Sequence, residues 1–144
     1  MDVGDGPRPL STASTASALA RLAELVSGLL FISEADHPLR VVSLGELEES
    51  ELPRALPAVA ARPGAEILQV PLPAFFERAT DAQPYHTDAD RLVVERYRAL
   101  VRFFTGELLD ARVYRVGAIE VDVYALGRSR EGQWLGVATQ VIET

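Results

Sequence analysis

The C-terminal stretch ARVYRVGAIEVDVYALGRSREGQWLGVATQVIET constrains the fold most, because apolar and polar residues alternate along much of it. Ile119, Val121 and Val123 are separated by single polar residues, which is the period of two typical of a β-strand. Residues 127–132 have the composition of a turn, so we predict that two long strands form a hairpin. A third strand is expected around residues 113–116.

Two amphipathic helices precede these strands. The first is expected over residues 17–27, where apolar residues recur at helical spacing and Gly28 follows as a terminator. The second begins after Thr87, which forms a capping-box pattern with Asp90. Its predicted apolar stripe consists of Val93, Tyr97, Leu100, Val101 and Phe104. Helices followed by consecutive strands indicate an α+β domain with a largely antiparallel sheet and a C-terminal hairpin.

Polar or proline-rich segments connect the expected helices and strands. The sequence SEAD (residues 33–36) and the sequence TDAQPYHTDAD (residues 80–90) are predicted to be polar loops. Residues 45–65 carry three prolines and an acidic cluster, and we expect a long connection there with at most a short helix. A short strand is predicted over residues 67–70, followed by one or two helical turns beginning at Pro73.

The N-terminal residues 1–16 are small, polar and rich in proline and glycine, and we expect a flexible arm there. Residues 17–144 are expected to form a single domain. Cysteine is absent, which excludes disulfides, thiolate metal sites and a cysteine nucleophile. No secretory leader or membrane-spanning apolar run is visible, so we expect a soluble cytoplasmic protein.

The net charge is −7, and all 14 basic residues are arginine. An acidic surface repels nucleic-acid phosphates, so direct binding of nucleic acid is disfavoured. It attracts basic proteins, although a charge of this size also serves solubility alone. The charge therefore favours a basic protein partner or no partner.

Catalytic patterns are weak in this sequence. His37 and His86 stand in different loops beside aspartates, which allows a two-histidine carboxylate metal site but is more typical of surface histidines. Ser33 lacks the strand–turn–helix context of an activated nucleophile. Glu120 and Asp122 share a strand face, where carboxylates are usually solvated rather than catalytic. Composition and spacing favour a protein that is not an enzyme and needs no cofactor.

The sequence GVATQVIET has a strand-like alternation that continues to Glu143 and Thr144. Chain ends usually fray, but no glycine, proline or charged tail separates these residues from the strand. An ordered strand end would present oxygen atoms rigidly, without the entropy loss that a floppy tail suffers on binding.

Four segments resemble the nuclease A inhibitor (NuiA-like) family in order and spacing: GLLFISEADHP, FFERAT, VYRVGAIEVDVYALG and GVATQVIET. The similarity runs from about Leu19 to Thr144. It implies a three-layer α-β-α sandwich with no enzymatic activity of its own. It also implies a protein that inhibits a sugar-non-specific, magnesium-dependent DNA/RNA endonuclease of the ββα-metal type by sealing the nuclease active site.

The resemblance also implies roles for individual residues. Thr144 corresponds to the C-terminal threonine that acts as an oxygen ligand of the nuclease's metal, and Glu143 precedes it. Glu34 matches a loop carboxylate that pairs with nuclease arginines. Pro84 and Tyr85 occupy the positions of an acidic residue and a tryptophan that complete the contact.

Those last two positions depart from the family pattern. Pro84 cannot form an ion pair, and Tyr85 offers a smaller aromatic surface than tryptophan. Either the partner nuclease differs at this point or the affinity is lower, unless Asp81 or Asp88 restores the charge. The alternative function is therefore a non-inhibitory binding module of the same fold with another basic partner.

Overall fold

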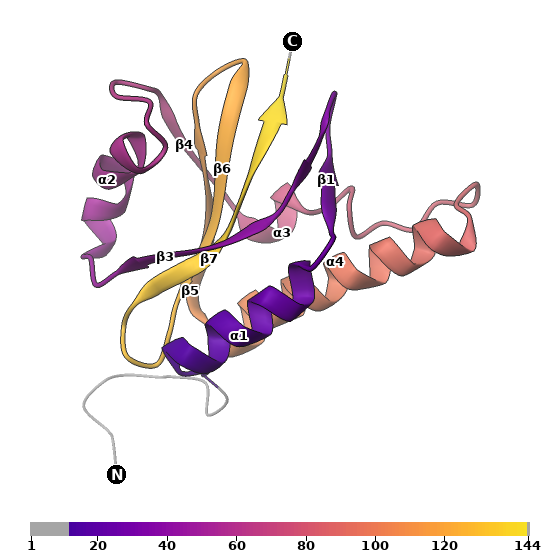
Figure 1. Cartoon of the computed structure of the whole chain (residues 1–144), viewed down its shortest axis with the longest axis horizontal. Helices are drawn as coiled ribbons and strands as arrows, with labels where there is room; N and C mark the ends of the chain where they lie inside the picture. The colour runs from indigo at the N-terminus through magenta and orange to yellow at the C-terminus, as the bar shows by residue number, and fades with distance from the viewer. Residues whose placement is uncertain (1–11, 144) are drawn as a thin grey trace.

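The alternating C-terminal segments form the centre of a five-stranded sheet in the computed structural model, which describes residues 12–143 (Figure 1). Every neighbouring pair of strands in this sheet is antiparallel. The strands lie in the order β3 (Arg40–Gly45), β7 (Trp134–Ile142), β6 (Glu120–Arg128), β5 (Leu109–Val116) and β4 (Ile67–Val70). The predicted α+β class, the C-terminal hairpin β6–β7 and the strand over residues 67–70 are confirmed.

Apolar side chains are buried on both faces of the sheet. Three helices pack on one face: α1 (Thr15–Val26), α3 (Leu72–Phe75) and α4 (Asp88–Glu107). The other face is covered by α2 (Leu52–Val59), which directly follows the short 3-10 helix η1 (Glu49–Glu51). Leu52 and Leu56 of α2 are fully buried against this second face, so the proline-rich connection contributes a core of its own.

Strand β6 is buried on both sides, contrary to the expectation that its polar face is solvated. Val123 belongs to the core under α1 and α4, whereas Tyr124 belongs to the core under α2. Asp122 is only 6% exposed and accepts a hydrogen bond from the Arg62 guanidinium, which follows α2. The prediction failed because residues 45–65 fold over this face and remove it from water.

The first helix begins earlier than predicted. Ser14 is its N-cap and accepts a hydrogen bond from the Ser17 amide, so α1 starts at Thr15. Thr12 and Ala13 are buried, and the Ala13 amide donates to the Glu107 carbonyl over 2.8 Å. The last residues of the expected arm therefore belong to the folded structure, while residues 1–11 lie outside the described residues.

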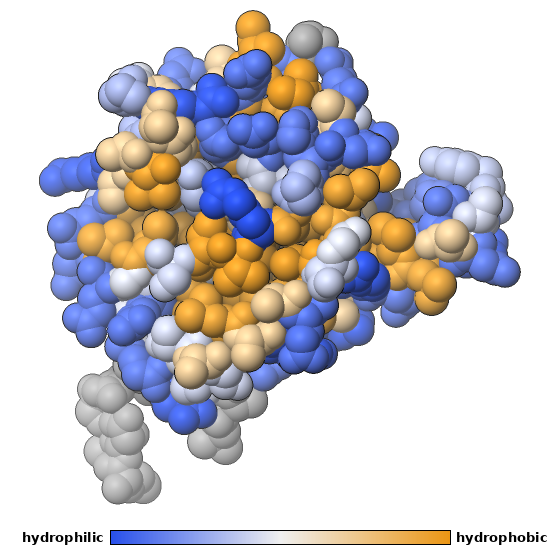
Figure 2. Space-filling model, viewed as in Figure 1, coloured by the Kyte–Doolittle hydropathy of each residue, from blue (hydrophilic) through white to orange (hydrophobic). Residues whose placement is uncertain are grey.

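The long helix α4 begins at the predicted capping box, in which Thr87 and Asp90 bond each other's backbone amides. Its buried stripe consists of Val94, Tyr97, Leu100, Phe103 and Phe104. Val93, placed in the stripe from sequence, is 38% exposed, and its neighbour Leu92 is 68% exposed. Valines at 93 and 94 both fit the helical period before Tyr97, and only docking on the sheet decides between them. Apolar surface is visible along the projecting part of α4 (Figure 2).

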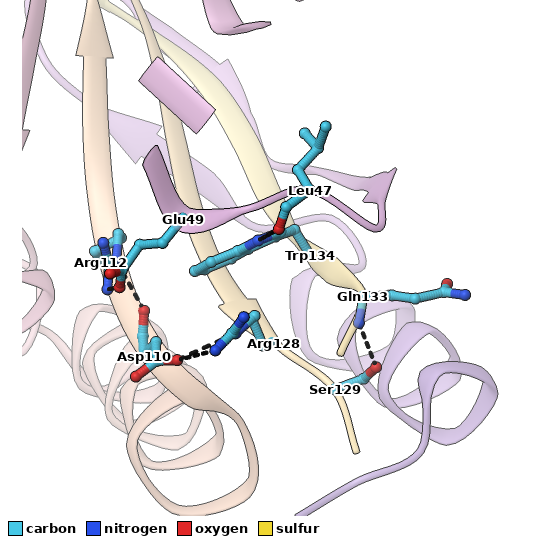
Figure 3. Close-up of polar contacts among 8 residues, drawn as sticks. All are labelled: Leu47, Glu49, Asp110, Arg112, Arg128, Ser129, Gln133 and Trp134. Atoms are coloured by element: carbon cyan, nitrogen blue, oxygen red, sulfur yellow. Dashed lines mark hydrogen bonds and ion pairs between the residues drawn. The ribbon is translucent and has the colours of Figure 1, made fainter. Parts of the chain in front are cut away.

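Trp134 of β7 holds the proline-rich connection (residues 45–65) against the sheet (Figure 3). The Trp134 ring is fully buried, and its Nε1 donates to the Leu47 carbonyl over 2.9 Å. The guanidinium carbons of Arg112 and Arg128 lie 5.4 Å and 5.2 Å from the ring centroid, at cation–π distance. Arg112 also pairs with Glu49 of η1, so the connection is held to the sheet by a hydrogen bond and an ion pair.

Candidate functional site

Three exposed segments contain the described residues that the sequence assigned to partner binding, namely Glu34, Pro84, Tyr85 and Glu143. They are the turn between β1 (Leu30–Ile32) and β2 (Asp36–Pro38), the loop that precedes α4, and the end of β7. The β1–β2 turn and the end of β7 rise next to each other, while the loop lies at the outer end of α4 (Figure 1). The segments are far apart in sequence, and their positions are set by the strands and helices that carry them.

The β1–β2 hairpin presents Glu34 at its turn. Phe31 pairs with His37, and Ile32 pairs with Asp36, which leaves residues 33–35 as the turn. The Ser33 hydroxyl donates to the Ala35 carbonyl over 2.9 Å, so the turn is closed by a side chain. Glu34 is exposed at this turn.

An aromatic cluster holds the hairpin against the helices. The Phe31 ring stacks on Phe75 with centroids 5.0 Å apart, and it meets the edges of Phe76 and Tyr97 at 6.1 Å. The Tyr97 hydroxyl donates to the Leu30 carbonyl over 2.6 Å. Burial raises the pKa of Tyr97, which keeps this hydroxyl a donor. The cluster therefore joins the hairpin to α3 and α4, the two helices that flank the loop carrying Tyr85.

The loop before α4 is ordered by its own side chains. The Gln83 amide donates to His86 Nδ1 over 3.0 Å, and the Gln83 side chain donates to Asp81 Oδ2 over 2.8 Å. Tyr85 is 79% exposed and contacts only the edge of His86 among the described aromatic rings. The loop therefore turns Tyr85 outward.

The two aspartates near Tyr85 are already engaged locally. Asp81 accepts the hydrogen bond from Gln83, and Asp88 pairs with Arg91 at 3.2 Å. Asp81, Pro84 and Asp88 are all exposed. Both carboxylates remain accessible to a partner, so either could supply the charge that Pro84 lacks.

The end of β7 is fixed by three contacts. The Ile142 amide donates to Ser33 Oγ over 3.2 Å, and the Glu143 amide donates to the Ile119 carbonyl over 2.9 Å. The Glu143 carboxylate pairs with the Arg115 guanidinium. Ordered structure thus continues to Glu143, and Thr144 lies outside the described residues.

Sequence reasoning missed two features of these segments. Ile32, an apolar strand residue, is 71% exposed beside the turn. The period of two could have indicated this, because Ile32 lies on the opposite side of β1 from Phe31, whose partly buried ring packs against the core. The Ser33 hydroxyl was considered only as a nucleophile, and its bond to the Ile142 amide spans 109 residues, which no local pattern predicts.

The catalytic alternatives find little support in the geometry. No group of three or more histidine, aspartate or glutamate side chains that could hold a metal occurs between residues 12 and 143. His86 Nδ1 accepts the Gln83 amide, and the Ser33 hydroxyl is used within its turn. Glu120 and Asp122 both pair with Arg62. These groups are placed as structural contacts within the described part of the chain.

The fold and the site define an acidic α+β protein whose exposed turns and strand end are carried on a packed scaffold, an arrangement suited to contacting another macromolecule. The sequence profile of the nuclease A inhibitor-like proteins matches residues 16–144, and the chain belongs to this family. No individual curated protein matches the sequence significantly. Among residues 12–143, no helix is long and apolar enough to span a bilayer.

Proposed function

We propose that this protein inhibits a sugar-non-specific, magnesium-dependent endonuclease of the ββα-metal type by sealing its active site. The observation that carries the proposal is the family match over residues 16–144, which includes all three exposed segments. The helices on both faces of the sheet support the finer reading of the fold as a three-layer α-β-α sandwich formed by residues 17–144. The cysteine-free composition fits a reducing compartment, and we place the protein in the cytoplasm.

Glu34 pairs with an arginine of the nuclease in this proposal. Nuclease sites attract polyanions and are therefore electropositive, so an exposed carboxylate on a braced hairpin is complementary to them. The aromatic cluster reduces the freedom that the hairpin would lose on binding.

Tyr85 and Pro84 form a second contact. An exposed aromatic ring on an ordered loop can enter a pocket of the partner at little entropic cost. Pro84 contributes shape and no charge, so an electrostatic contact at this position requires Asp81 or Asp88.

Thr144 supplies an oxygen ligand to the nuclease's magnesium ion. Magnesium prefers oxygen ligands and keeps open water positions in catalytic sites, so a hydroxyl or carboxylate can enter there. The contacts at Ile142 and Glu143 hold the chain as far as the residue that precedes Thr144, which supports this role. Glu143, paired with Arg115, adds negative charge at the rim of the contact.

A non-inhibitory binding module with another basic partner is the second candidate. The observation that favours it is the presence of Pro84 and Tyr85 where the family has an acidic residue and tryptophan. Affinity capture with the purified protein separates the candidates, because inhibition requires a nuclease among the captured proteins.

The direct test is a DNA-cleavage assay with a purified metal-dependent endonuclease of the ββα-metal type, taken from the source organism where its genome encodes one. The parent protein should inhibit cleavage at a one-to-one ratio. Deletion of Thr144, or addition of a few glycine and serine residues after it, should weaken inhibition while circular dichroism shows an unchanged fold. A nuclease that does not use a metal serves as the control and should be unaffected. Full inhibition by both variants would exclude the metal-ligand role, and no inhibition by the parent would favour the binding module.

A further inference from the structure

The position of the β1–β2 hairpin relative to β7 is not set by a shared backbone ladder. The two strands of the hairpin form a separate two-stranded sheet outside the five-stranded one. Backbone pairing with β7 begins only beyond the base of the hairpin, where β3 follows β2 after Leu39 and Arg40 pairs with Ala138. Nearer the turn, side-chain hydrogen bonds join the hairpin to β7.

Two hydroxyl groups bridge the hairpin and β7. Near the base of the hairpin, Thr139 Oγ1 of β7 donates to the Pro38 carbonyl over 3.0 Å. At the turn, Ser33 Oγ accepts from the Ile142 amide over 3.2 Å while it donates to the Ala35 carbonyl over 2.9 Å. Ser33 is adjacent to Glu34, and Ile142 is adjacent to Glu143, so the second bridge joins two of the proposed contact segments directly.

The Ile142 amide lacks a strand partner on the outer side of β7. The register of β3 with β7 extends from Trp134 only to Ala138, so β3 does not flank the last residues of β7. On the inner side, β6 pairs with β7 up to Ile142. Ser33 Oγ therefore takes the place of the carbonyl that a longer edge strand would offer.

We propose that Ser33 is a positioning residue that locks the end of β7 to the Glu34 turn, so that both reach the nuclease as one preorganised unit. The inference rests on the proposed inhibitory function and deepens it. If the bond is lost, the end of β7 gains freedom that binding must remove again, and inhibition weakens although no contact to the nuclease has been deleted.

Amide hydrogen exchange in the free protein tests the lock without a nuclease. Ser33→Ala should accelerate exchange of the Ile142 amide by about tenfold, because the acceptor is lost, while amides in the middle of β7 keep their protection. Ser33→Thr keeps a hydroxyl and should restore protection. Thr105→Ala is the matched control, because within residues 12–143 its exposed hydroxyl bonds its own helix, at the carbonyls of Val101 and Arg102. Unchanged Ile142 exchange in Ser33→Ala would overturn the proposal.

A double-mutant cycle tests whether Ser33 acts through the strand end. Ser33→Ala should weaken inhibition by about tenfold in the parent, and should cause much less loss in a variant that lacks Thr144. If the fold-loss of inhibition in the double variant equals the product of the two single fold-losses, Ser33 and the strand end act independently and the proposed coupling is wrong. If the parent inhibits no nuclease, the proposed function fails separately. Accelerated Ile142 exchange would then still support the lock, and unchanged exchange would still overturn it.

Discussion

The side chains in the three exposed segments are of two kinds. Some hold a segment in place through contacts within the protein, and others are exposed and available to a partner. Ser33 and Phe31 hold the hairpin, whereas Glu34 at its turn is exposed. In the loop before α4, His86 accepts a backbone amide and Tyr85 points outward. Substitution of a presented residue should therefore change binding and leave the fold intact, which makes the proposed contacts testable one at a time.

Glu34→Ala should weaken inhibition by about 2–5 kcal/mol, because a nuclease arginine would be left buried without its charge partner. The measurement is the inhibition constant, with thermal unfolding to confirm that the hairpin is intact. Glu24→Ala is the matched control. Glu24 is exposed on α1, and its ion pair with Arg21 is a loose surface pair at 3.9 Å. Equal inhibition constants for Glu34→Ala and the parent would exclude the assigned role.

Tyr85→Ala should leave the unfolding temperature unchanged, because the ring is 79% exposed in the free protein. It should weaken inhibition by about 2 kcal/mol or more if the ring fills a pocket of the nuclease. Tyr85→Trp restores the family's aromatic residue and should inhibit at least as strongly as the parent. The prediction is contradicted if Tyr85→Ala inhibits normally or if it destabilises the free protein.

At the scale of elements, the start of α4 and the packing of β7 are each set by one small feature. The capping box fixes where α4 begins and hence where the Tyr85 loop ends. A glycine in the middle of β7 permits close contact with β6. Gly136 pairs with Leu126, and a Cβ atom at Gly136 would lie 1.8 Å from the Ala125 carbonyl oxygen. Local sequence identified the first feature, but the second depends on a neighbouring strand.

The capping box should loosen in acid. The pKa of Asp90 lies below its ordinary value of 3.8. The larger cause is the hydrogen bond from the Thr87 backbone amide to the carboxylate, and the smaller one is the side-chain contact with Thr87. The carboxylate therefore stabilises the helix start above pH 3.8, and this contribution is lost as the pH falls through the lowered folded pKa. NMR titration of the Asp90 carboxyl should give a midpoint below 3.8, with the Thr87 amide shift following it. In Asp90→Asn the shift of that amide should lose this pH dependence, and a midpoint at or above the ordinary value would contradict the prediction.

Gly136→Ala should destabilise the protein by about 1–3 kcal/mol or more, because the strands must separate to admit the new methyl group. Chemical denaturation gives the free energy of unfolding. Gly106→Ala is a suitable control, since a Cβ atom there meets nothing within 4 Å in helix α4. That control should be neutral or stabilising by up to about 1 kcal/mol, as expected for glycine to alanine in a helix. Equal stability of the two variants would show that β6 and β7 are not in such close contact.

For the whole molecule, the net charge of −7 dominates long-range behaviour. The charge opposes binding of nucleic acid and favours encounter with the electropositive site of a nuclease. The scaffold keeps the acidic Glu34 turn and the end of β7 on one side, where β1–β2 and β7 meet (Figure 1). Approach and final docking should consequently respond differently to salt.

The association rate with the nuclease should fall by about tenfold or more between 50 and 500 mM salt, because screening removes electrostatic steering. The dissociation rate should change much less, since the docked contacts are shielded from solvent. Stopped-flow measurements at several salt concentrations give both rates. Glu34→Gln should reduce the salt dependence of association, and a salt-independent association rate would exclude steering by the acidic surface.

Short-range patterns determined much of this structure. The period of two located β6, the Thr87–Asp90 pattern located the start of α4, and Gly28, with φ of +70°, follows the end of α1 as predicted. The polar turn at Glu34 was also predicted, because polar residues between two apolar runs cannot be buried without partners. Each of these features depends on residues within a few positions of one another.

Tertiary structure decided what depends on distant residues. Asp122 is buried because residues 45–65 fold over its face of the sheet, and Val94 is buried instead of Val93 because of how α4 docks. The bond between Ser33 and Ile142 joins residues 109 positions apart. Hydrophobic period and capping chemistry act within one element and are readable in the sequence. Packing of the elements alone decides which faces of the sheet are covered. It also decides which side-chain hydroxyl lies within hydrogen-bonding distance of which backbone amide.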